Sequence, residues 1–391
     1  MLLKKQSNLT PSGSLFSMQG LCVCYEGTEQ GVVEEVARIL RISSSSCEMK
    51  KAVVIVQLAQ RKDLFKLAYL GQSFSQVLEL LHSFSCSALD DLSSLEKFDF
   101  SFLAGKRFRV DCVRVGDHSF RSQDLEQELG GVILEHVQAQ VDLHNPEIIL
   151  FVYLCEHTAY LGVDYVGFDL SKRDYNVYPH SSSIKGPLAY ALLSIADYSS
   201  EKRLLDPFCL SGMIPIEAAF RATGFSLNYF RKKKFLFVKQ SLVTDTFFEE
   251  LDTTIPSKPL PITGVDHNLP NITASKHNAK LAGLEKVIDF RRGDTQWIDF
   301  KFEPHSIDCV IMAPPRPTGR SLVLVQKRLE ELFQNLSEVM TKNAAMVILD
   351  NGMVRSLAEK YGYVLKEEHK IKKGNATMMV LVYAASFKDK K

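Results

Sequence analysis

Leu205-Asp-Pro-Phe-Cys-Leu-Ser-Gly-Met-Ile-Pro-Ile-Glu217 is the stretch that decides the fold. In it, a short apolar strand runs into a turn of small residues and then into a helix, whose free N-terminal amides favour an anionic group. Asp206 ends the strand, where a carboxylate can receive an ammonium group, and Gly212 allows close approach to the backbone. The pattern alone fits either a ligand-binding loop or an ordinary turn.

The sequence after residue 185 alternates between strand and helix patterns, which predicts a parallel sheet with helices on both faces. We expect strands at 203–206, 262–266, 287–291, 307–312 and 344–349, and helices at 214–223, 270–282 and 321–340. Lys372-Lys-Gly-Asn375 is a reverse-turn signal, so residues 362–369 and 375–385 should form an antiparallel hairpin at the sheet edge. The lysines of this turn are expected to be solvated.

Two more loops follow strands of this sheet, at the edge where open parallel sheets bind ligands. Asp266 ends the second strand and is placed to accept both hydroxyls of a ribose, although a helix cap explains it equally well. Asp294 follows the third strand, where its carboxylate either reads an adenine amino group or lies in a surface turn.

The first half has an α+β pattern. Strands are expected at 21–25, 52–58, 106–115, 147–155 and 159–168, and helices at 29–41, 73–84 and 121–140. Residues 106–115 alternate basic or polar with apolar side chains, which predicts a strand with one wet, partly positive face.

Composition predicts a multidomain globular protein: 391 residues are 46% hydrophobic and 24% charged. The net charge is only +1, so a nucleic-acid partner must be held by local clusters of Lys and Arg. The eight cysteines include no Cys-x-x-Cys pair, which favours reduced thiols over a metal site. Because the apolar runs have only strand length, we expect no membrane span and a cytoplasmic location.

The order of the three loops resembles that of class I, Rossmann-like methyltransferases, in particular RNA methyltransferases with a THUMP domain. That family reads Asp-Pro-x-Cys-Gly-Ser-Gly-Thr and then Ile-Glu-Ala, and this chain reads Asp206-Pro-Phe-Cys-Leu-Ser-Gly-Met213 and then Ile216-Glu-Ala-Ala219. Four other stretches resemble the family's pre-sheet helix, second helix, Arg-rich THUMP strand and the insert of guanine-N2 enzymes: 180–191, 267–283, 109–122 and 228–248.

The resemblance implies a ferredoxin-like N-terminal region at 1–60, a THUMP RNA-binding domain at 61–168, a linker at 169–185 and a class I methyltransferase domain at 186–391. It implies S-adenosylmethionine as cofactor and a base in structured RNA as substrate, the exocyclic amine of guanine in tRNA or 23S rRNA. We expect a monomer without a metal.

The resemblance also implies which residues form the sites. Asp206, Ser211 and Gly212 hold the amino-acid end of the cofactor, Asp266 the ribose and Asp294 the adenine, and the neighbouring cofactor residues are Pro207, Cys209, His267 and Thr295. Two basic clusters are expected to contact RNA phosphates, although such runs are often only solvated: Arg107, Arg109, Arg114, His118 and Arg121, and Arg231, Lys232, Lys233 and Lys234.

The sequence departs from the family at two places. Leu210 replaces the first glycine of the cofactor loop, and Ala313-Pro314-Pro315-Arg316 replaces Asn/Asp-Pro-Pro-Tyr/Phe, which borders the target base. Arg316 could still stack on a base through its guanidinium, and the Pro314 carbonyl could accept a hydrogen bond. The alternative is a catalytically impaired homologue that acts as an RNA-binding adaptor. A protein methyltransferase, which would not need the first half, and a cysteine nucleophile are further alternatives.

Overall fold

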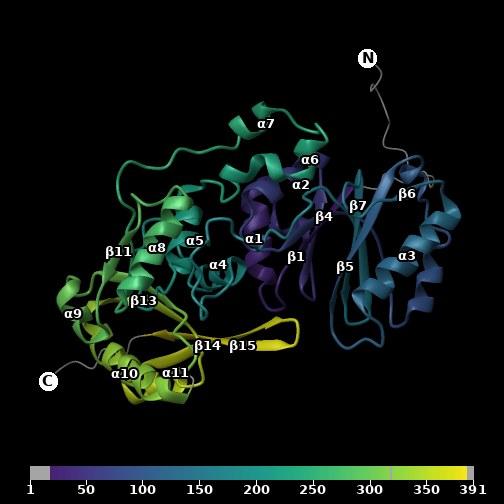
Figure 1. Cartoon of the computed structure of the whole chain (residues 1–391). Helices are drawn as coiled ribbons and strands as arrows, with labels where there is room; N and C mark the ends of the chain where they lie inside the picture. The colour runs from purple at the N-terminus through teal and green to yellow at the C-terminus, as the bar shows by residue number, and fades with distance from the viewer. Residues whose placement is uncertain (1–17, 318, 385–391) are drawn as a thin grey trace.

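The computed structural model describes residues 18–317 and 319–384, which form two mixed sheets flanked by helices (Figure 1). The first sheet has eight strands in the order β2-β3-β1-β4-β8-β7-β5-β6. Its strands are β1 (Met18–Val23), β2 (Cys47–Lys50), β3 (Val53–Leu58), β4 (Gln76–Ser85), β5 (Arg107–Val115), β6 (Gln140–Val141), β7 (Ile148–Cys155) and β8 (Thr158–Asp164).

Three helices cover this N-terminal sheet. α1 (Glu29–Leu40) and α2 (Arg61–Leu70) share one core, and α3 (Ser122–His136) packs Leu125, Leu129 and Ile133 into another. The connections contain short 3-10 helices, η1 (Ser44–Ser46), η2 (Leu89–Leu95) and η3 (Ser101–Leu103). Because β4 pairs with both β1 and β8, one continuous sheet joins the two parts of this half.

The helix predicted at 73–84 is wrong, because residues 76–85 form strand β4. The apolar run Val77 to Leu81 suits either element, and pairing with β1 and β8 decides in favour of a strand. The helix of this segment lies earlier, at α2, where Asp63 Oδ2 accepts a hydrogen bond from the Gln60 backbone N–H at 3.2 Å. That capping pattern was the missed signal.

The boundary between the ferredoxin-like region and the THUMP domain, expected between residues 60 and 61, stays a prediction.

The second sheet confirms the predicted Rossmann-like architecture and its antiparallel final hairpin. Its order is β11-β10-β9-β12-β13-β15-β14, in which only β15 runs antiparallel to its neighbours. The strands are β9 (Leu204–Asp206), β10 (Ile262–Asp266), β11 (Asp289–Arg292), β12 (Ile307–Met312), β13 (Met340–Leu349), β14 (Val364–Lys373) and β15 (Ala376–Ala384).

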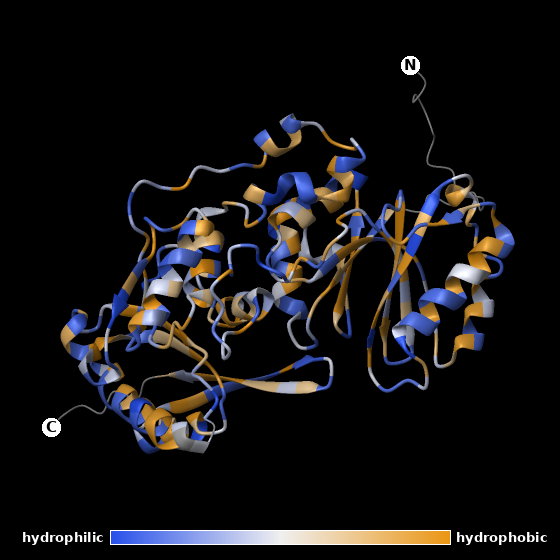
Figure 2. Cartoon of the chain, in the orientation of Figure 1, coloured by the Kyte–Doolittle hydropathy of each residue, from blue (hydrophilic) through white to orange (hydrophobic). Residues whose placement is uncertain are grey.

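Helices cover both faces of this sheet, as βαβ connections require. One face carries α4 (Gly186–Ile195), α5 (Met213–Thr223) and α8 (Leu269–Leu281), and the other carries α10 (Leu322–Val339) and α11 (Val354–Lys360). Figure 2 shows the matching pattern, with apolar residues concentrated in the strands and mixed residues on the helices. The shorter helices are η4 (Tyr229–Lys234), α6 (Leu236–Lys239), α7 (Asp245–Glu249), η5 (Thr295–Trp297), α9 (Ile298–Lys301) and η6 (Gly319–Ser321).

Two segments of the C-terminal half cross onto the N-terminal half. The insert between α5 and β10 stacks Phe237 on Phe65 of α2, with ring centroids 4.4 Å apart. The β14–β15 hairpin reaches the β1–α1 turn (Figure 1), where the Lys372 N–H donates to the Glu26 carbonyl and Lys372 Nζ to Glu26 Oε1, both at 2.9 Å. The expectation that Lys372 is only solvated is therefore wrong.

Within residues 18–317 and 319–384, no helix is long and apolar enough to cross a membrane. The same residues contain no group of three or more His, Cys, Asp and Glu that could hold a metal ion.

Candidate active site

The three predicted loops meet at the carboxyl edge of the second sheet. In the parallel register, Asp206 of β9 lies beside Gly264 of β10, and Asp266 lies beside Arg292 of β11. The Gly293 N–H then donates to the Asp266 carbonyl at 3.0 Å. The chain order reverses between β9 and β12, so this edge contains the switch point at which such sheets bind ligands.

Asp206 is a buried carboxylate without a cationic partner among the described residues. Its side chain belongs to a residue only 1% exposed, and Oδ1 accepts the Phe208 backbone N–H at 3.1 Å. Burial raises the pKa of Asp206 well above its ordinary value, and the nearby Asp266 carboxylate raises it further. A ligand that brings an ammonium group would supply the missing positive charge.

Asp266 links the first two loops. It is 3% exposed, Oδ2 accepts the Leu210 N–H at 3.1 Å, and Oδ1 accepts the Asn268 N–H at 2.8 Å. His267 Nδ1 lies 3.3 Å from Oδ1. Burial and the charge of Arg328 lower the pKa of His267. The two hydrogen bonds that Asp266 accepts therefore hold the loop. Contact of its carboxylate with a ribose remains a prediction.

Leu210 adopts the left-handed conformation that the family's glycine would favour, with φ of 50°. Left-handed backbone costs a residue with a Cβ roughly 1–2 kcal/mol. Hydrogen bonds hold both sides of this peptide: its N–H donates to Asp266, and its carbonyl accepts from Ser275 Oγ at 3.0 Å. The loop thus keeps a glycine-like backbone, with the leucine side chain buried.

Both the backbone conformation at residue 212 and the close packing around it require a glycine. Its φ is 84°, and an added Cβ would lie 3.0 Å from Phe290 Cζ and 3.0 Å from Ser275 Cβ. Next to it, the Ser211 hydroxyl is 2.6 Å from the Ser183 hydroxyl in the segment before α4. These contacts fix the turn that precedes helix α5.

Cys209 lies in the same loop with a buried thiol, 3% exposed. Burial raises the pKa of Cys209 well above its ordinary value, and Asp206 and Asp266 raise it further. The thiol is therefore not poised to act as a nucleophile. Pro207 is also buried, so the predicted contacts of both residues with a cofactor would involve mainly their backbone.

Asn278 is a positioning residue that sequence reasoning missed. It is fully buried on α8, and its Nδ2 donates to the Ser211 carbonyl at 3.0 Å and to the Tyr178 carbonyl at 3.1 Å. Its Oδ1 accepts the Tyr178 N–H at 3.0 Å. Asn278 thereby ties the segment before α4 to the first loop. The signal in the sequence was a polar residue at a helix position that faces the core.

The third loop uses its polar groups partly for its own structure. Asp294 caps η5, since its Oδ1 accepts the Thr295 N–H at 2.9 Å. Thr295 is 3% exposed, and its hydroxyl lies 3.4 Å from Glu331 Oε2 on α10. Asp294 remains half-buried at the sheet edge, where contact with an adenine stays a prediction.

The Ala313–Arg316 loop follows β12, the strand paired with β9. Ala313 and Pro314 are buried, Pro315 is half-buried and Arg316 is exposed. Asn351, after β13, donates from Nδ2 to the Pro315 carbonyl at 3.1 Å. This contact was not predicted. It leaves the Pro314 carbonyl as the acceptor that the family resemblance implies.

The predicted RNA-contacting residues of the first half lie along β5 and its following turn. At the start of the strand, Arg107 lies 3.4 Å from both Asp142 and Glu147, and Arg109 lies 2.7 Å from Asp111. After the strand, Arg121 lies 2.9 Å from Asp124. Exposed ion pairs of this kind contribute little to stability, so these cations can exchange their partners for phosphates.

Arg114 lies at the other end of the strand, and His118 lies in the turn that follows. Arg114 lies over the Phe120 ring at 5.4 Å, and His118 Nε2 lies 2.5 Å from the Glu156 carbonyl. Their contact with RNA remains a prediction.

Arg231 is a correction to the predicted RNA-contacting set. It is only 4% exposed, lies over the Phe168 ring at 4.6 Å, and its Nη1 donates to the Lys172 carbonyl at 2.7 Å. Arg231 therefore holds the segment between β8 and α4 and is not presented to a phosphate. Lys232 pairs with Asp252 at 2.5 Å, while Lys233 is exposed.

A buried polar network at the seam between the halves also escaped sequence reasoning. Glu217 of α5 is fully buried and accepts from Arg173 Nε, from the Tyr175 hydroxyl and from Gln72 Nε2, each at 2.7 Å. Arg173 Nη2 donates at 2.6 Å to the Gln72 carbonyl. The helix that follows the first loop is thus joined directly to the segment between β8 and α4 and to the N-terminal half.

Comparison with known proteins agrees with this geometry. The family model for the RMKL-like methyltransferase domain, UPF0020, matches residues 173–377, and the THUMP domain model matches residues 94–164. The tRNA (guanine(6)-N2)-methyltransferase of Archaeoglobus fulgidus is 28% identical over 79% of this chain and 79% of its own length. The ribosomal RNA large subunit methyltransferase K/L of Vibrio parahaemolyticus is 25% identical over 72% of this chain and 41% of its own length.

Solved structures share the fold. TrmN from Thermus thermophilus superposes with a TM-score of 0.67 at 21% identity and covers 94% of this chain and 100% of its own. SMU.472, a putative methyltransferase complexed with SAH, gives a TM-score of 0.74 at 20% identity and covers 95% and 99%.

Proposed function

Because the chain belongs to the RMKL-like methyltransferase family, we propose that it transfers a methyl group from S-adenosylmethionine to the exocyclic amine of a guanine in tRNA. The observation that carries this proposal is the buried Asp206 carboxylate, which has no cationic partner within residues 18–317 and 319–384 and lies at the switch point of a class I sheet, on the strand next to the one that leads into the Ala313–Arg316 loop.

The lengths of the relatives favour tRNA over 23S rRNA. The chain matches 79% of the Archaeoglobus fulgidus tRNA enzyme but only 41% of the Vibrio parahaemolyticus rRNA enzyme. The aligned region includes a THUMP match at residues 94–164.

The edge residues fit S-adenosylmethionine, which supplies an electrophilic methyl group when bound. Asp206 receives the cofactor's ammonium group, since a buried carboxylate favours a cationic partner. The turn at Ser211 and Gly212 lies at the start of α5, where backbone amides face the carboxylate end. Asp266 and His267 border the ribose, and Asp294 and Thr295 border the adenine.

The Ala313–Arg316 loop borders the target guanine. The Pro314 carbonyl accepts a hydrogen bond from the amine and orients the nitrogen lone pair, so no strong general base is required. Arg316 is exposed and its planar guanidinium stacks on the base in place of the family's aromatic ring. The cations along β5 and the exposed Lys233 contact phosphates and set the position of the RNA.

Methyl transfer from radiolabelled S-adenosylmethionine to tRNA and 23S rRNA tests the proposal, with mass spectrometry of the digested nucleosides as readout. We expect N2-methylguanosine in tRNA. Methylation of 23S rRNA alone would identify rRNA, and not tRNA, as the substrate. RNA binding with neither methylation nor cofactor binding would contradict the proposal and favour the RNA-binding adaptor.

A further inference from the structure

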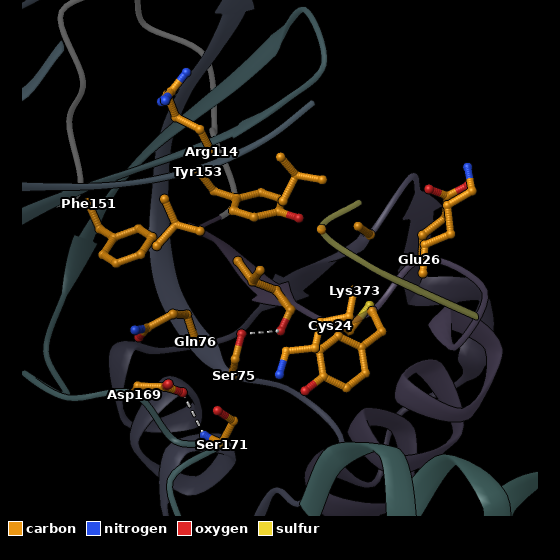
Figure 3. Close-up of a pocket in the computed structure, with 17 residues that line it drawn as sticks. Cys24, Glu26, Ser75, Gln76, Arg114, Phe151, Tyr153, Asp169, Ser171 and Lys373 are labelled. Carbon is orange, nitrogen blue, oxygen red and sulfur yellow. Dashed lines mark hydrogen bonds and ion pairs between the residues drawn. The ribbon is translucent and has the colours of Figure 1, made fainter. Parts of the chain in front are cut away.

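A cavity of about 390 Å³ lies where the β14–β15 hairpin meets the N-terminal sheet, and we call it the hairpin cavity. Residues from the sheet, the linker and the hairpin turn surround it (Figure 3). Cavities that bind small molecules have volumes of roughly 300–1,000 Å³. The hairpin cavity is therefore large enough for a nucleotide-sized group, and it is separate from the loops at Asp206 and Ala313.

One wall of the hairpin cavity is apolar and aromatic. Phe151 and Tyr153 of β7 are 4% and 3% exposed, and Val113 of β5, opposite Tyr153 in the strand register, is 45% exposed. Figure 3 shows the two rings on one side of the cavity, with Cys24 and Glu26 on the other. Because the two rings are almost fully buried, Val113 supplies the accessible apolar surface of this wall, and such a surface suits the face of an unpaired nucleobase.

Gln76 adds a polar group that lacks a partner. The residue lines the cavity at the start of β4 and is 9% exposed, and its Oε1 is buried without a hydrogen-bond partner among the described residues. A buried acceptor is costly unless a ligand or water supplies a donor. An amide can also donate and accept together, which matches the edge of a base.

Cations complete the lining and connect it to the predicted RNA-contacting surface. Lys373 reaches from the hairpin turn to within 5.8 Å of the Tyr25 ring centroid, and Arg114 contributes from β5. Arg114 also belongs to the row of cations that continues to His118 and Arg121 along the chain. Two carboxylates also line the cavity: Glu26 pairs with Lys372, and Asp169 accepts the Ser171 N–H. Positive charge for a phosphate therefore comes from Arg114 and Lys373, one from each half.

We propose that the hairpin cavity binds one unpaired nucleotide of the substrate RNA. Its base lies against Phe151, Tyr153 and Gln76, and its phosphate lies near Arg114 and Lys373. This inference rests on the proposed function, because it takes RNA as the substrate. Since the hairpin is part of the catalytic sheet, a nucleotide held there fixes the RNA to both halves of the chain and sets its position relative to the target loop.

Filling the cavity in the full-length protein tests this directly. Val113→Trp places a large ring in the space, and Val141→Trp is its matched control, since Val141 lies on β6 of the same sheet, is also 45% exposed and does not line the cavity. The probe is a short fluorescein-labelled single-stranded RNA, measured by anisotropy. We expect Val113→Trp to weaken binding roughly tenfold and Val141→Trp to leave it unchanged. Equal affinity of Val113→Trp and wild type would overturn the proposal.

Gln76→Met keeps the side-chain size and removes the amide. We expect it to weaken binding of the same probe, to leave SAH binding unchanged and to leave the temperature of thermal unfolding equal or higher, because a costly unpartnered acceptor is removed. Unchanged RNA affinity of Gln76→Met would overturn the contact with the base edge. Failure of this proposal and failure of the proposed function can be distinguished. If Val113→Trp loses RNA binding but the wild-type protein methylates no RNA, only the proposed function is contradicted. If the wild type methylates tRNA but Val113→Trp binds RNA as well as the wild type, only the nucleotide site in the hairpin cavity is contradicted.

Discussion

Two buried carboxylates lie on either side of the same turn and have opposite surroundings. Glu217 on α5 is fully buried and is met by Arg173, Tyr175 and Gln72. Asp206 at the end of β9 is 1% exposed and accepts the Phe208 backbone N–H, with no ion pair among the described residues. The protein therefore neutralises one buried acid by itself and leaves the other to a ligand.

Glu217 and its partners stabilise the fold, whereas Asp206 is available to a ligand. A paired buried charge resists removal of either partner, because the remaining charge is left without compensation. An unpaired buried acid costs stability when ionised, and a cationic ligand recovers that cost on binding. Substitution of Glu217 should therefore lower the free energy of unfolding, whereas substitution of Asp206 should weaken cofactor binding.

The largest effect is expected at the paired acid. Glu217→Gln leaves Arg173 buried without its counter-charge, so the free energy of unfolding should fall by about 3–5 kcal/mol. Urea denaturation measures this change. Glu156→Gln is the control, because Glu156 forms an exposed pair with Lys51 and should cost at most about 1 kcal/mol. Equal losses at Glu217 and Glu156 would contradict a structural role for the seam network.

Asp206→Asn should have its effect on the ligand. It removes the charge that receives the cofactor's ammonium group, so SAH affinity should fall by about 10- to 100-fold, as measured by calorimetry. The unfolding free energy of the cofactor-free protein should not fall, because the buried charge is gone. Asp197→Asn, at a side chain that is 98% exposed, serves as the control and should change neither quantity.

The pH dependence sharpens the comparison. Burial raises the pKa of Asp206 in the folded protein, so the folded chain binds this proton more tightly than the unfolded chain. Stability contributed by Asp206 is then lost as the pH rises from the ordinary aspartate range through the raised pKa, while SAH affinity increases over the same range. Thermal unfolding and calorimetry across pH should show both trends in wild type. Persistence of both trends in Asp206→Asn would assign them to another group.

Leu210→Gly should produce the smallest change in SAH affinity. Relief of the left-handed backbone is worth roughly 1–2 kcal/mol, and the extra freedom of glycine in the unfolded chain offsets about 0.5–1 kcal/mol of it. Removal of the buried leucine side chain costs about 2–5 kcal/mol, more than the relieved strain returns, so we expect lower stability and an SAH affinity that changes by less than tenfold. Weaker SAH binding by Leu210→Gly would show that the leucine side chain itself contributes to the cofactor site.

Features encoded by neighbouring residues could be predicted from the sequence, and features that depend on distant contacts could not. The β9 strand, its turn and α5 follow from one continuous stretch, and the Lys372–Asn375 turn correctly predicted the final hairpin. Strand β4 was missed because its apolar run fits a helix until β1 and β8 pair with it.

The site shows the same division. Asp206 and Asp266 could be placed at the sheet edge because strand ends locate them. The burial of Arg231 could not be predicted, because it depends on the Lys172 carbonyl, 59 positions away. The pairing of Gln72 with Glu217 spans 145 positions.

Calorimetric titration of the wild-type protein and Asp206→Asn with SAH at neutral pH tests the central claim most directly. We expect saturable binding of one SAH molecule per wild-type chain and a large loss of affinity in the variant. Absence of binding to the wild type, or equal affinity of the two proteins, would contradict the assignment of the Asp206 edge as the cofactor site.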